Sequence, residues 1–183
     1  MKLPNIIGIA GTLSSGKDTL ADYLTDNYGY THVSTGDMVR AEAKKRYGNI
    51  ERPTLQIVGP ELRVEGGAGV LVKKALEQPK PIVITGIRAI GEAKALKEAG
   101  GVLLFIDAYV EIRYERMVKR ARDAESVISL EKFTESERKE VAAGEKDEDY
   151  NQVVIQNMSD KTINNSGNLE TLYKIATDYL SKI

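Results

Sequence analysis

The stretch GIAGTLSSGKDTLADYL, residues 8–24, decides the fold, because two glycines bracket four residues and a lysine follows the second glycine. The apolar run NIIGIA (5–10) before the loop predicts a buried strand. After the loop, Leu20, Ala21 and Leu24 recur at helical spacing. A glycine-rich loop between a strand and a helix is the context in which backbone amides cradle phosphates. The sequence therefore predicts a phosphate-binding loop at the start of an α/β domain.

Each residue type in this loop has a physical role. Glycine lets the backbone approach a phosphate closely, the helix N-terminus adds partial positive charge, and Lys17 supplies a full charge to the terminal phosphates. Asp18 stands where a hydroxyl usually follows the lysine, and Thr19 brings the hydroxyl one residue later. Asp18 either holds magnesium through a water or favours the helix N-terminus. The residues expected to contact the donor nucleotide here are Gly11, Leu13, Ser14, Ser15, Gly16, Lys17, Asp18 and Thr19.

Short apolar runs alternate with helical patterns along the rest of the chain. The expected strands are 5–10, 31–35, 81–86, 102–107 and 161–165. The expected helices are 17–28, 37–46, two within 53–77 split near Gly66 and Gly67, 89–99, 110–122, 130–142 and 169–182, and 144–152 is expected to be a loop. Strands that are apolar throughout and alternate with helices predict a parallel sheet covered on both faces. Ligands bind such sheets beyond the carboxyl ends of the strands.

Composition narrows the classes of function. The chain has 183 residues, is 42% hydrophobic and 29% charged, and carries a formal net charge of −1. It has no cysteine and one histidine, His32, which excludes disulfides, thiolate metal sites and multi-histidine metal sites. No apolar run is long enough to span a membrane, and we interpret the N-terminus as the first strand, not a signal peptide. We therefore expect one cytoplasmic domain, a monomer or homodimer, without a membrane or nucleic-acid partner.

Several motifs resemble those of small P-loop kinases. The spacing GK-x-T is similar to GKGT of adenylate kinases and GKDT of viral deoxynucleoside monophosphate kinases. STGDMVR (34–40) resembles the TGDMLR stretch of adenylate kinases, and TGIRAIGEA (85–93) resembles their DGFPR segment. The resemblance implies that Arg40 and Arg88 hold the acceptor's phosphate and that Glu92 lies near the acceptor base. Thr85 replaces the family's magnesium-organising acid, and whether Asp18, Asp37 or Asp107 compensates stays open.

The second half of the chain resembles dephospho-CoA kinases. MSDKTINNSGNLETL (158–172) is similar to their closing strand and helix, which implies that Asn165 and Gly167 lie beside the donor adenine. The alternative is a plain strand-to-helix turn, which Asn and Gly also favour. Asp37 stands where that family carries an acid that activates an acceptor hydroxyl, and the alternative is an N-terminal cap of the following helix.

Basic residues provide further candidates. In VEIRYERMVKRARDAE (110–125), Arg120 and Arg122 match the lid arginines of the small-kinase superfamily, which close over the transferring phosphoryl group. Arg113 and Arg116 are more typical of surface or sheet-packing residues. Arg63 falls in the segment where these kinases place an acceptor-binding insertion, so it is a candidate phosphate contact. Asp107 ends an apolar strand and is either a metal ligand or a turn residue. The candidate metal ligands are Asp18, Thr19 and Asp107.

The resemblance implies a three-layer P-loop NTPase fold with a five-stranded parallel sheet, helices on both faces, and helical acceptor-binding and lid segments. We divide the single domain 1–183 into a core (1–48, 80–122 and 158–183), an acceptor-binding insertion (about 49–79) and a lid (about 120–157). The implied activity is ATP- and Mg²⁺-dependent phosphoryl transfer to a nucleotide-like small molecule, first a nucleoside or deoxynucleoside monophosphate. The expected catalytic residues are Lys17, Asp37, Arg120 and Arg122.

Alternatives stay open at the level of function. One is dephospho-CoA kinase-like transfer to a hydroxyl. Another is a regulatory P-loop ATPase without a small-molecule acceptor. The chain also resembles uncharacterised P-loop proteins that are loosely labelled AAA-family ATPases. A guanine-nucleotide switch is disfavoured, because no N-K-x-D or T-K-x-D base reader follows the fourth or fifth strand.

Overall fold

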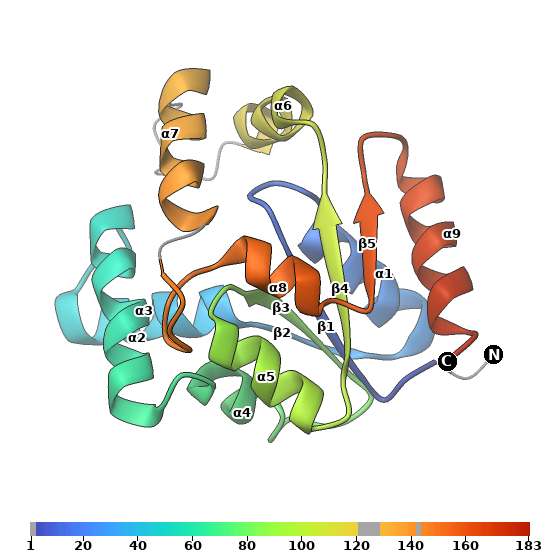
Figure 1. The fold of residues 1–183 in the computed structure, drawn as a ribbon, viewed down its shortest axis with the longest axis horizontal. Coiled ribbons are helices and arrows are strands. Elements are labelled where there is room, and N and C mark those ends of the chain that lie inside the picture. Colours follow the sequence, from blue (N-terminus) through green and yellow to red (C-terminus); the bar gives the residue numbers. More distant parts are fainter. Residues whose placement is uncertain (1–2, 121–128, 142–143) are drawn as a thin grey trace.

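The computed structural model describes residues 3–120, 129–141 and 144–183. Its centre is a five-stranded sheet in the order β2-β3-β1-β4-β5, in which each neighbouring pair is parallel (Figure 1). The strands are β1 (Ile6–Gly11), β2 (Thr31–Ser34), β3 (Ile82–Ile87), β4 (Val102–Asp107) and β5 (Lys161–Asn164). The predicted α/β fold with a five-stranded parallel sheet is confirmed.

Helices connect the strands and cover the sheet. In the described ranges they are α1 (Lys17–Tyr28), α2 (Thr35–Tyr47), α3 (Arg52–Gly66), α4 (Val70–Ala75), α5 (Ile90–Glu98), α6 (Val110–Arg120), α7 (Leu130–Val141), α8 (Gln152–Met158) and α9 (Leu169–Leu180). Among the described residues, we find no helix with the length and apolarity that crossing a bilayer would require.

The sheet is buried on both faces at its centre, because successive residues of β1, β3 and β4 point to opposite sides and both sets are mostly apolar. On one face, Ile9 and Leu104 share a core with Leu20 of α1 and Leu172 of α9. On the other face, Phe105 shares a core with residues of α4, α5 and α8. This three-layer packing leaves the carboxyl edge of the sheet to the loops that follow the strands.

The insertion between β2 and β3 has a small core of its own. Ala43 of α2 packs with Val58 and Leu62 of α3 and with Leu71 of α4. The expected break between two helices is present, because α3 ends at Gly66 and α4 begins at Val70. The segment between β2 and β3 thus consists of three helices at the end of the sheet that carries β2, and of these α3 and α4 fall in the expected insertion (Figure 1).

Helix α7 is anchored to α6 through one aromatic side chain. Phe133 is fully buried, and its ring lies edge-on to Tyr114 of α6 with the ring centres 5.9 Å apart. The anchored helix belongs to the segment expected to form the lid.

The sequence analysis assigned no helix to residues 152–158, and this was wrong at α8. Asn151 caps α8 by accepting a hydrogen bond from the Val154 amide at 3.0 Å, and Ile155 is fully buried under the sheet's second face. A helix of seven residues shows too few turns for its period to stand out beside the polar run that precedes it.

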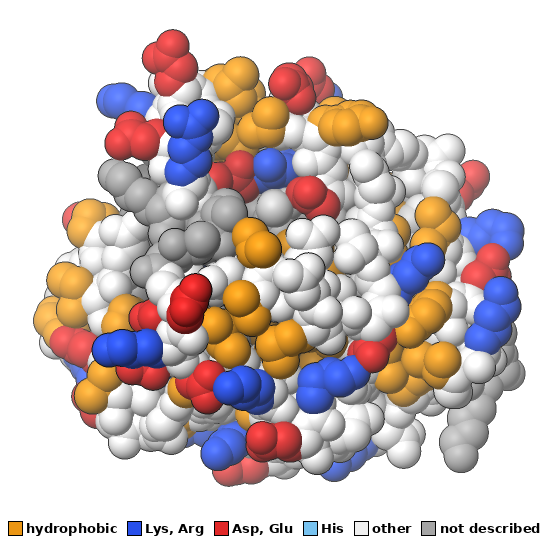
Figure 2. All heavy atoms as spheres, in the orientation of Figure 1, with side chains coloured by type: hydrophobic (Ala, Val, Ile, Leu, Met, Phe, Trp, Pro, Cys, Tyr) orange, Lys and Arg blue, Asp and Glu red, His pale blue; other side chains and the backbone are white. Residues whose placement is uncertain are grey.

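Charges of both signs are interspersed on the surface. On the face shown in Figure 2, the acidic and basic side chains of the described residues alternate around apolar patches. This distribution agrees with the formal net charge of −1.

Candidate functional site

The loop that joins β1 to α1 has backbone conformations that suit glycine. Gly11 has a φ of 139° and Gly16 a φ of 100°, while Ser14 lies in the left-handed region at 57°. A Cβ on Gly11 would lie 1.9 Å from the carbonyl oxygen of Ile106 in β4, so no larger residue fits there without moving the backbone. Gly16 is the N-cap residue of α1 and has no side chain to cap the helix. The first amides of α1 are therefore left as donors for an anion.

Lys17 and two serines complete the cradle. The Lys17 ammonium donates to the carbonyl oxygen of Gly11 at 3.0 Å and to that of Thr12, so it lies across the loop. The hydroxyl oxygens of Ser14 and Ser15 are buried and make no hydrogen bond within the described part of the chain. Buried hydroxyls without a partner are costly unless a ligand satisfies them. Together with the uncapped helix, they fit the polyphosphate of a nucleotide.

The residues at the start of α1 also fit magnesium. Asp18 and Thr19 lie in the first turn of α1 and offer a carboxylate and a hydroxyl, which are hard oxygen ligands of the kind Mg²⁺ prefers. In the described ranges, no group of three or more acidic or histidine side chains gathers as a ready-made metal cage. Magnesium in nucleotide sites is usually held by one or two protein oxygens together with phosphates and water. Asp18 and Thr19 match that pattern, and their metal role stays a prediction.

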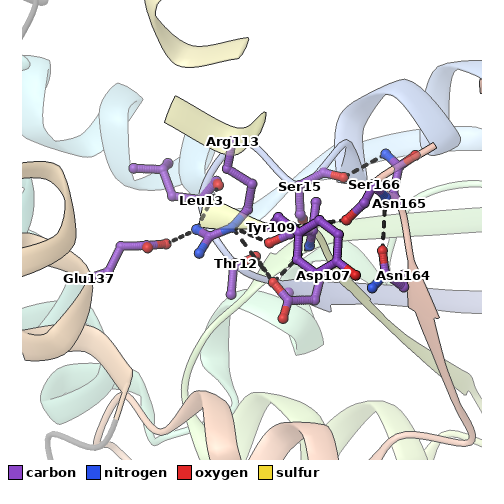
Figure 3. A network of polar contacts seen from close by, with 12 residues as sticks. Thr12, Leu13, Ser15, Asp107, Tyr109, Arg113, Glu137, Asn164, Asn165 and Ser166 are labelled. Carbon is purple, nitrogen blue, oxygen red and sulfur yellow. Dashed lines mark hydrogen bonds and ion pairs between the residues drawn. The ribbon is translucent and has the colours of Figure 1, made fainter. Parts of the chain in front are cut away.

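Asp107, the third expected metal ligand, braces the loop in this structure. Its Oδ1 accepts a hydrogen bond from the Thr12 hydroxyl at 2.6 Å and from the Ala108 amide at 2.9 Å (Figure 3). The guanidinium Nε of Arg113 lies 3.7 Å from the same oxygen. The carboxylate therefore links the end of β4 to the phosphate loop, and of the two alternatives left open by the sequence, these contacts support the turn role.

Arg113 holds the loop from the other side. It donates to the carbonyl oxygens of Ala108 at 2.8 Å and Leu13 at 3.3 Å, and it pairs with Glu137 of α7 (Figure 3). Its side chain is 8% exposed. The sequence interpretation of Arg113 as a surface or sheet-packing residue was therefore wrong. Arg113 connects the phosphate loop to α7. Its bond to Leu13 joins residues that lie 100 positions apart in the sequence.

The turn after β5 also contacts the phosphate loop. The Asn165 side-chain amide donates to the Ser15 carbonyl oxygen at 2.8 Å, which orients the Asn165 Oδ1 away from that bond. That oxygen is buried and has no hydrogen-bond partner among the described residues. Gly167, the other expected donor-base residue, has open space around it. The turn is thus adjacent to the loop, and its contact with a base stays a prediction.

The sequence analysis interpreted Arg116 as a surface or sheet-packing residue, but its contacts make it a candidate site residue. Its Nη2 donates to the Asn165 carbonyl oxygen at 2.8 Å, while its buried Nη1 has no partner in the described ranges. Burial lowers the pKa of the Arg116 guanidinium from its ordinary value. The spacing of three residues from Arg113 on α6 was the available signal. Because one guanidinium nitrogen of Arg116 contacts Asn165 and the other has no hydrogen-bond partner among the described residues, Arg116 is part of the candidate site.

Two predicted acceptor residues lie at the start of α2. The helix is capped by Ser34, whose hydroxyl accepts from the Asp37 amide at 3.3 Å, so the Asp37 side chain is not the cap. Instead, Asp37 accepts from Arg40 Nε at 3.0 Å in an exposed pair. The Thr35 hydroxyl donates to the Gly86 carbonyl oxygen at 2.7 Å, which ties this helix to the end of β3. Arg88 follows β3 directly, so the three candidates occupy neighbouring strand ends.

The structure gives Arg63 and Glu92 partners other than an acceptor. Both side chains are buried, and the Arg63 guanidinium donates to Glu92 Oε1 at 2.7 and 3.0 Å. Burial by itself would lower the pKa of Arg63, but Glu92 and Tyr150 raise it above its ordinary value. We therefore correct the expectation that these two residues contact the acceptor directly, because each satisfies the other away from solvent.

The two predicted lid arginines are only partly covered by the structure. Arg122 lies outside the described residues, as does the side chain of Arg120, although its backbone ends α6. Their role in phosphoryl transfer stays a prediction.

The comparisons with known proteins agree with this geometry. A family model described as an AAA domain matches residues 8–134. The chain is 32% identical to a UPF0200 protein of Pyrobaculum aerophilum, over 76% of this chain and 79% of that protein. It is also 32% identical to an adenylate kinase of Bacteroides fragilis, over 66% of this chain and 69% of that protein. A UPF0200/UPF0201 protein of Archaeoglobus fulgidus is 30% identical over 97% of this chain. The present chain spans only about half, 55%, of the length of that protein.

Solved structures show the same fold. Shikimate kinase from Bacteroides thetaiotaomicron superposes with a TM-score of 0.62 at 10% identity, over 97% of this chain and 98% of that chain. The protein TT1252 from Thermus thermophilus superposes with a TM-score of 0.60 at 22% identity, over 100% and 99% of the two chains. At these identities the likeness concerns the fold.

Proposed function

Since the chain belongs to the AAA domain family matched above, within the superfamily of P-loop nucleotide and small-molecule kinases, we propose that it is an ATP-dependent phosphotransferase. The proposed acceptor is a nucleotide-like molecule, foremost a nucleoside or deoxynucleoside monophosphate. One observation carries the proposal: the phosphate loop after β1 is followed along the same sheet edge by the ends of β3 and β2, which bear Arg88, Asp37 and Arg40. A donor cradle thus adjoins cationic groups suited to a second phosphate.

The proposed chemistry is positioning and charge stabilisation. Amides of the loop, together with Ser14 and Ser15, would hold the donor phosphates, and Lys17 would move from the loop carbonyls to the terminal phosphates. Asp18 and Thr19 would hold Mg²⁺, which would supply charge neutralisation at the phosphate oxygens. An oxygen of the acceptor's phosphate bonds to the γ-phosphorus as the bond to the β-bridging oxygen breaks, and ADP leaves. Arg120 and Arg122 are proposed to balance the charge that develops.

The kinases among the relatives support this acceptor class. The adenylate kinase of Bacteroides fragilis and a UMP-CMP kinase of Arabidopsis thaliana, 29% identical over 75% of this chain and 53% of its own, carry nucleotide kinase names. The ion pair between Asp37 and Arg40 supports both classes of acceptor, because its carboxylate suits a hydroxyl and its guanidinium suits a phosphate. Transfer to a hydroxyl, as in dephospho-CoA kinases, is therefore the second candidate.

A coupled assay of ADP release tests the proposal. Purified protein with ATP and magnesium is expected to release ADP only slowly until AMP, CMP, UMP, dTMP or dephospho-CoA is added one at a time. A kinase responds to an acceptor because closure and charge are completed only when both substrates are bound. Turnover that is equally fast without any acceptor would instead indicate a regulatory ATPase and contradict the proposal.

Replacing Arg88 with alanine is expected to raise the KM for the monophosphate by about tenfold or more, because a charge-assisted hydrogen bond to phosphate is lost. The KM for ATP is expected to stay within about twofold, since the donor cradle is untouched. Lys45→Ala, on the exposed side of α2, is the control and should change neither constant. A loss of ATP affinity in the Arg88 variant would show that Arg88 serves the donor.

A further inference from the structure

A buried ion pair joins the insertion to the core. The side chains of Arg63 on α3 and Glu92 on α5 are 2% and 0% exposed, and the guanidinium donates two hydrogen bonds to Oε1 of the carboxylate. Arg63 also donates to the Tyr150 hydroxyl at 3.3 Å, with its guanidinium carbon 4.8 Å from the centre of that ring. Three segments that are far apart in the sequence therefore meet at one buried charge pair, where the chain before α8 passes between α3 and α5 (Figure 1).

The second carboxylate oxygen of Glu92 is bonded to the backbone that carries Arg88. Its Oε2 accepts from the Arg88 amide at 2.9 Å and from the Ala89 amide at 3.2 Å. On the other side, the Arg88 carbonyl oxygen accepts from the Asn151 amide at 3.3 Å. Both backbone polar groups of Arg88, and the amide after it, are thus fixed by hydrogen bonds.

Packing of the two side chains alone does not explain this arrangement, because Glu92 also caps α5 through the Ala89 amide. Replacing a buried ion pair by apolar side chains of similar volume is often neutral or stabilising, because two charges need not be taken out of water. Apolar side chains, however, cannot accept hydrogen bonds from two backbone amides. Beyond packing, the pair therefore supplies the Glu92 Oε2 atom as an oriented acceptor for the amides of Arg88 and Ala89. Arg63 holds the Glu92 carboxylate in place through its other oxygen, Oε1.

We propose that Glu92 is a positioning residue that fixes the backbone of Arg88 for recognition of the acceptor's phosphate, and that Arg63 supports it by neutralising its buried carboxylate. This inference rests on the proposed function, since it gives Arg88 the acceptor role. Glu92 sets the position of Arg88 directly, and Arg63 acts through Glu92. Because Arg63 belongs to α3, the insertion and the segment that carries Arg88 are joined as one unit. Pre-ordering of this kind lowers the entropy lost when the phosphate is bound.

Two double variants separate positioning from packing. Arg63→Met/Glu92→Gln removes both charges but keeps one oxygen that can accept from the amides of Arg88 and Ala89. Arg63→Met/Glu92→Met removes the charges and that oxygen while keeping a similar volume. Each variant is compared with the wild type by thermal unfolding, by hydrogen exchange of the two amides without ligand, and by steady-state kinetics. The kinetic probes are ATP with AMP, CMP, UMP and dTMP.

The glutamine variant is expected to keep amide protection and acceptor KM within about threefold of the wild type. The methionine variant is expected to lose protection of both amides by about tenfold or more and to raise the acceptor KM by a similar factor, since small displacements of a positioning group are costly. Its KM for ATP should stay within about twofold. Equal protection and equal acceptor KM in the two variants, or a parallel change in both KM values, would overturn the inference.

A matched control and a ligand-free measurement keep the two hypotheses apart. Lys174→Met/Asp178→Asn removes an exposed ion pair of α9 and should change none of these quantities. Exchange of the Arg88 and Ala89 amides needs no acceptor, so it judges the hydrogen bonds to Glu92 whatever the activity. A wild-type protein that transfers phosphate to none of the four monophosphates overturns the monophosphate acceptor class and the acceptor role given to Arg88. Altered exchange with an unaltered acceptor KM overturns the positioning role alone.

Discussion

Lys17→Ala is expected to lower ATP-dependent turnover by about two to three orders of magnitude, the scale seen when one preorganised group is removed from developing charge. The side chain spans the phosphate loop by donating to the carbonyl oxygens of Gly11 and Thr12. No other lysine of the described residues lies in this loop, and the neighbouring Arg113 guanidinium is bonded to the Leu13 and Ala108 carbonyl oxygens. The free energy of unfolding should fall by no more than about 3 kcal/mol, the upper contribution of a hydrogen bond from a charged group, because the Lys17 bonds to these carbonyls are only partly buried.

Measurement of kcat/KM for ATP and of the thermal midpoint checks this prediction. Lys174→Ala, on the exposed surface of α9, is the matched control, and its turnover should equal that of the wild type. Near-normal turnover in the Lys17 variant would remove the central role of the phosphate loop. Loss of the fold together with activity would show instead that Lys17 is needed for structure.

The fold was predictable because its signals are local. The three central strands, β1, β3 and β4, are short apolar runs, and such runs indicate buried parallel strands. The phosphate loop was predictable for the same reason, since Gly11, Gly16 and Lys17 lie within seven residues. Helix α8 was missed because it is short, and its burial depends on contact with strands distant in sequence.

The remainder of the site depends on long-range contacts that no local pattern encodes. Arg63 and Glu92 were expected to reach an acceptor, but the folded chain brings these two oppositely charged residues together across 29 positions. Asn165 bonds to Ser15 across 150 positions, which makes a turn at the end of the chain part of the phosphate loop's surroundings. Residue type and spacing indicated candidate side chains, whose chemical roles stay predictions. Which partner each one takes is decided by how the strands are ordered in the sheet.

The second large effect concerns the class of acceptor. Asp37→Asn is expected to lower transfer to a hydroxyl acceptor by about 10²–10⁴-fold, the usual contribution of a general base. Transfer to a monophosphate should fall by less than about tenfold, because a phosphate is already ionised and needs no proton removed. Asparagine keeps an oxygen that can accept from Arg40 Nε, which Asp37 does at 3.0 Å, so the guanidinium should hold its place.

The comparison requires both reactions in the same preparation, with dephospho-CoA and the best monophosphate as acceptors and ATP as donor. Asp26→Asn, an exposed aspartate of α1, is the control and should leave both rates unchanged. A selective loss with dephospho-CoA would show that Asp37 activates a hydroxyl. Equal losses with both acceptors would contradict the base role, since a residue that only orders Arg40 affects every acceptor bound by that arginine. Because Asp37 and Arg40 form one pair, the ratio of the two losses is the quantity that assigns the acceptor class.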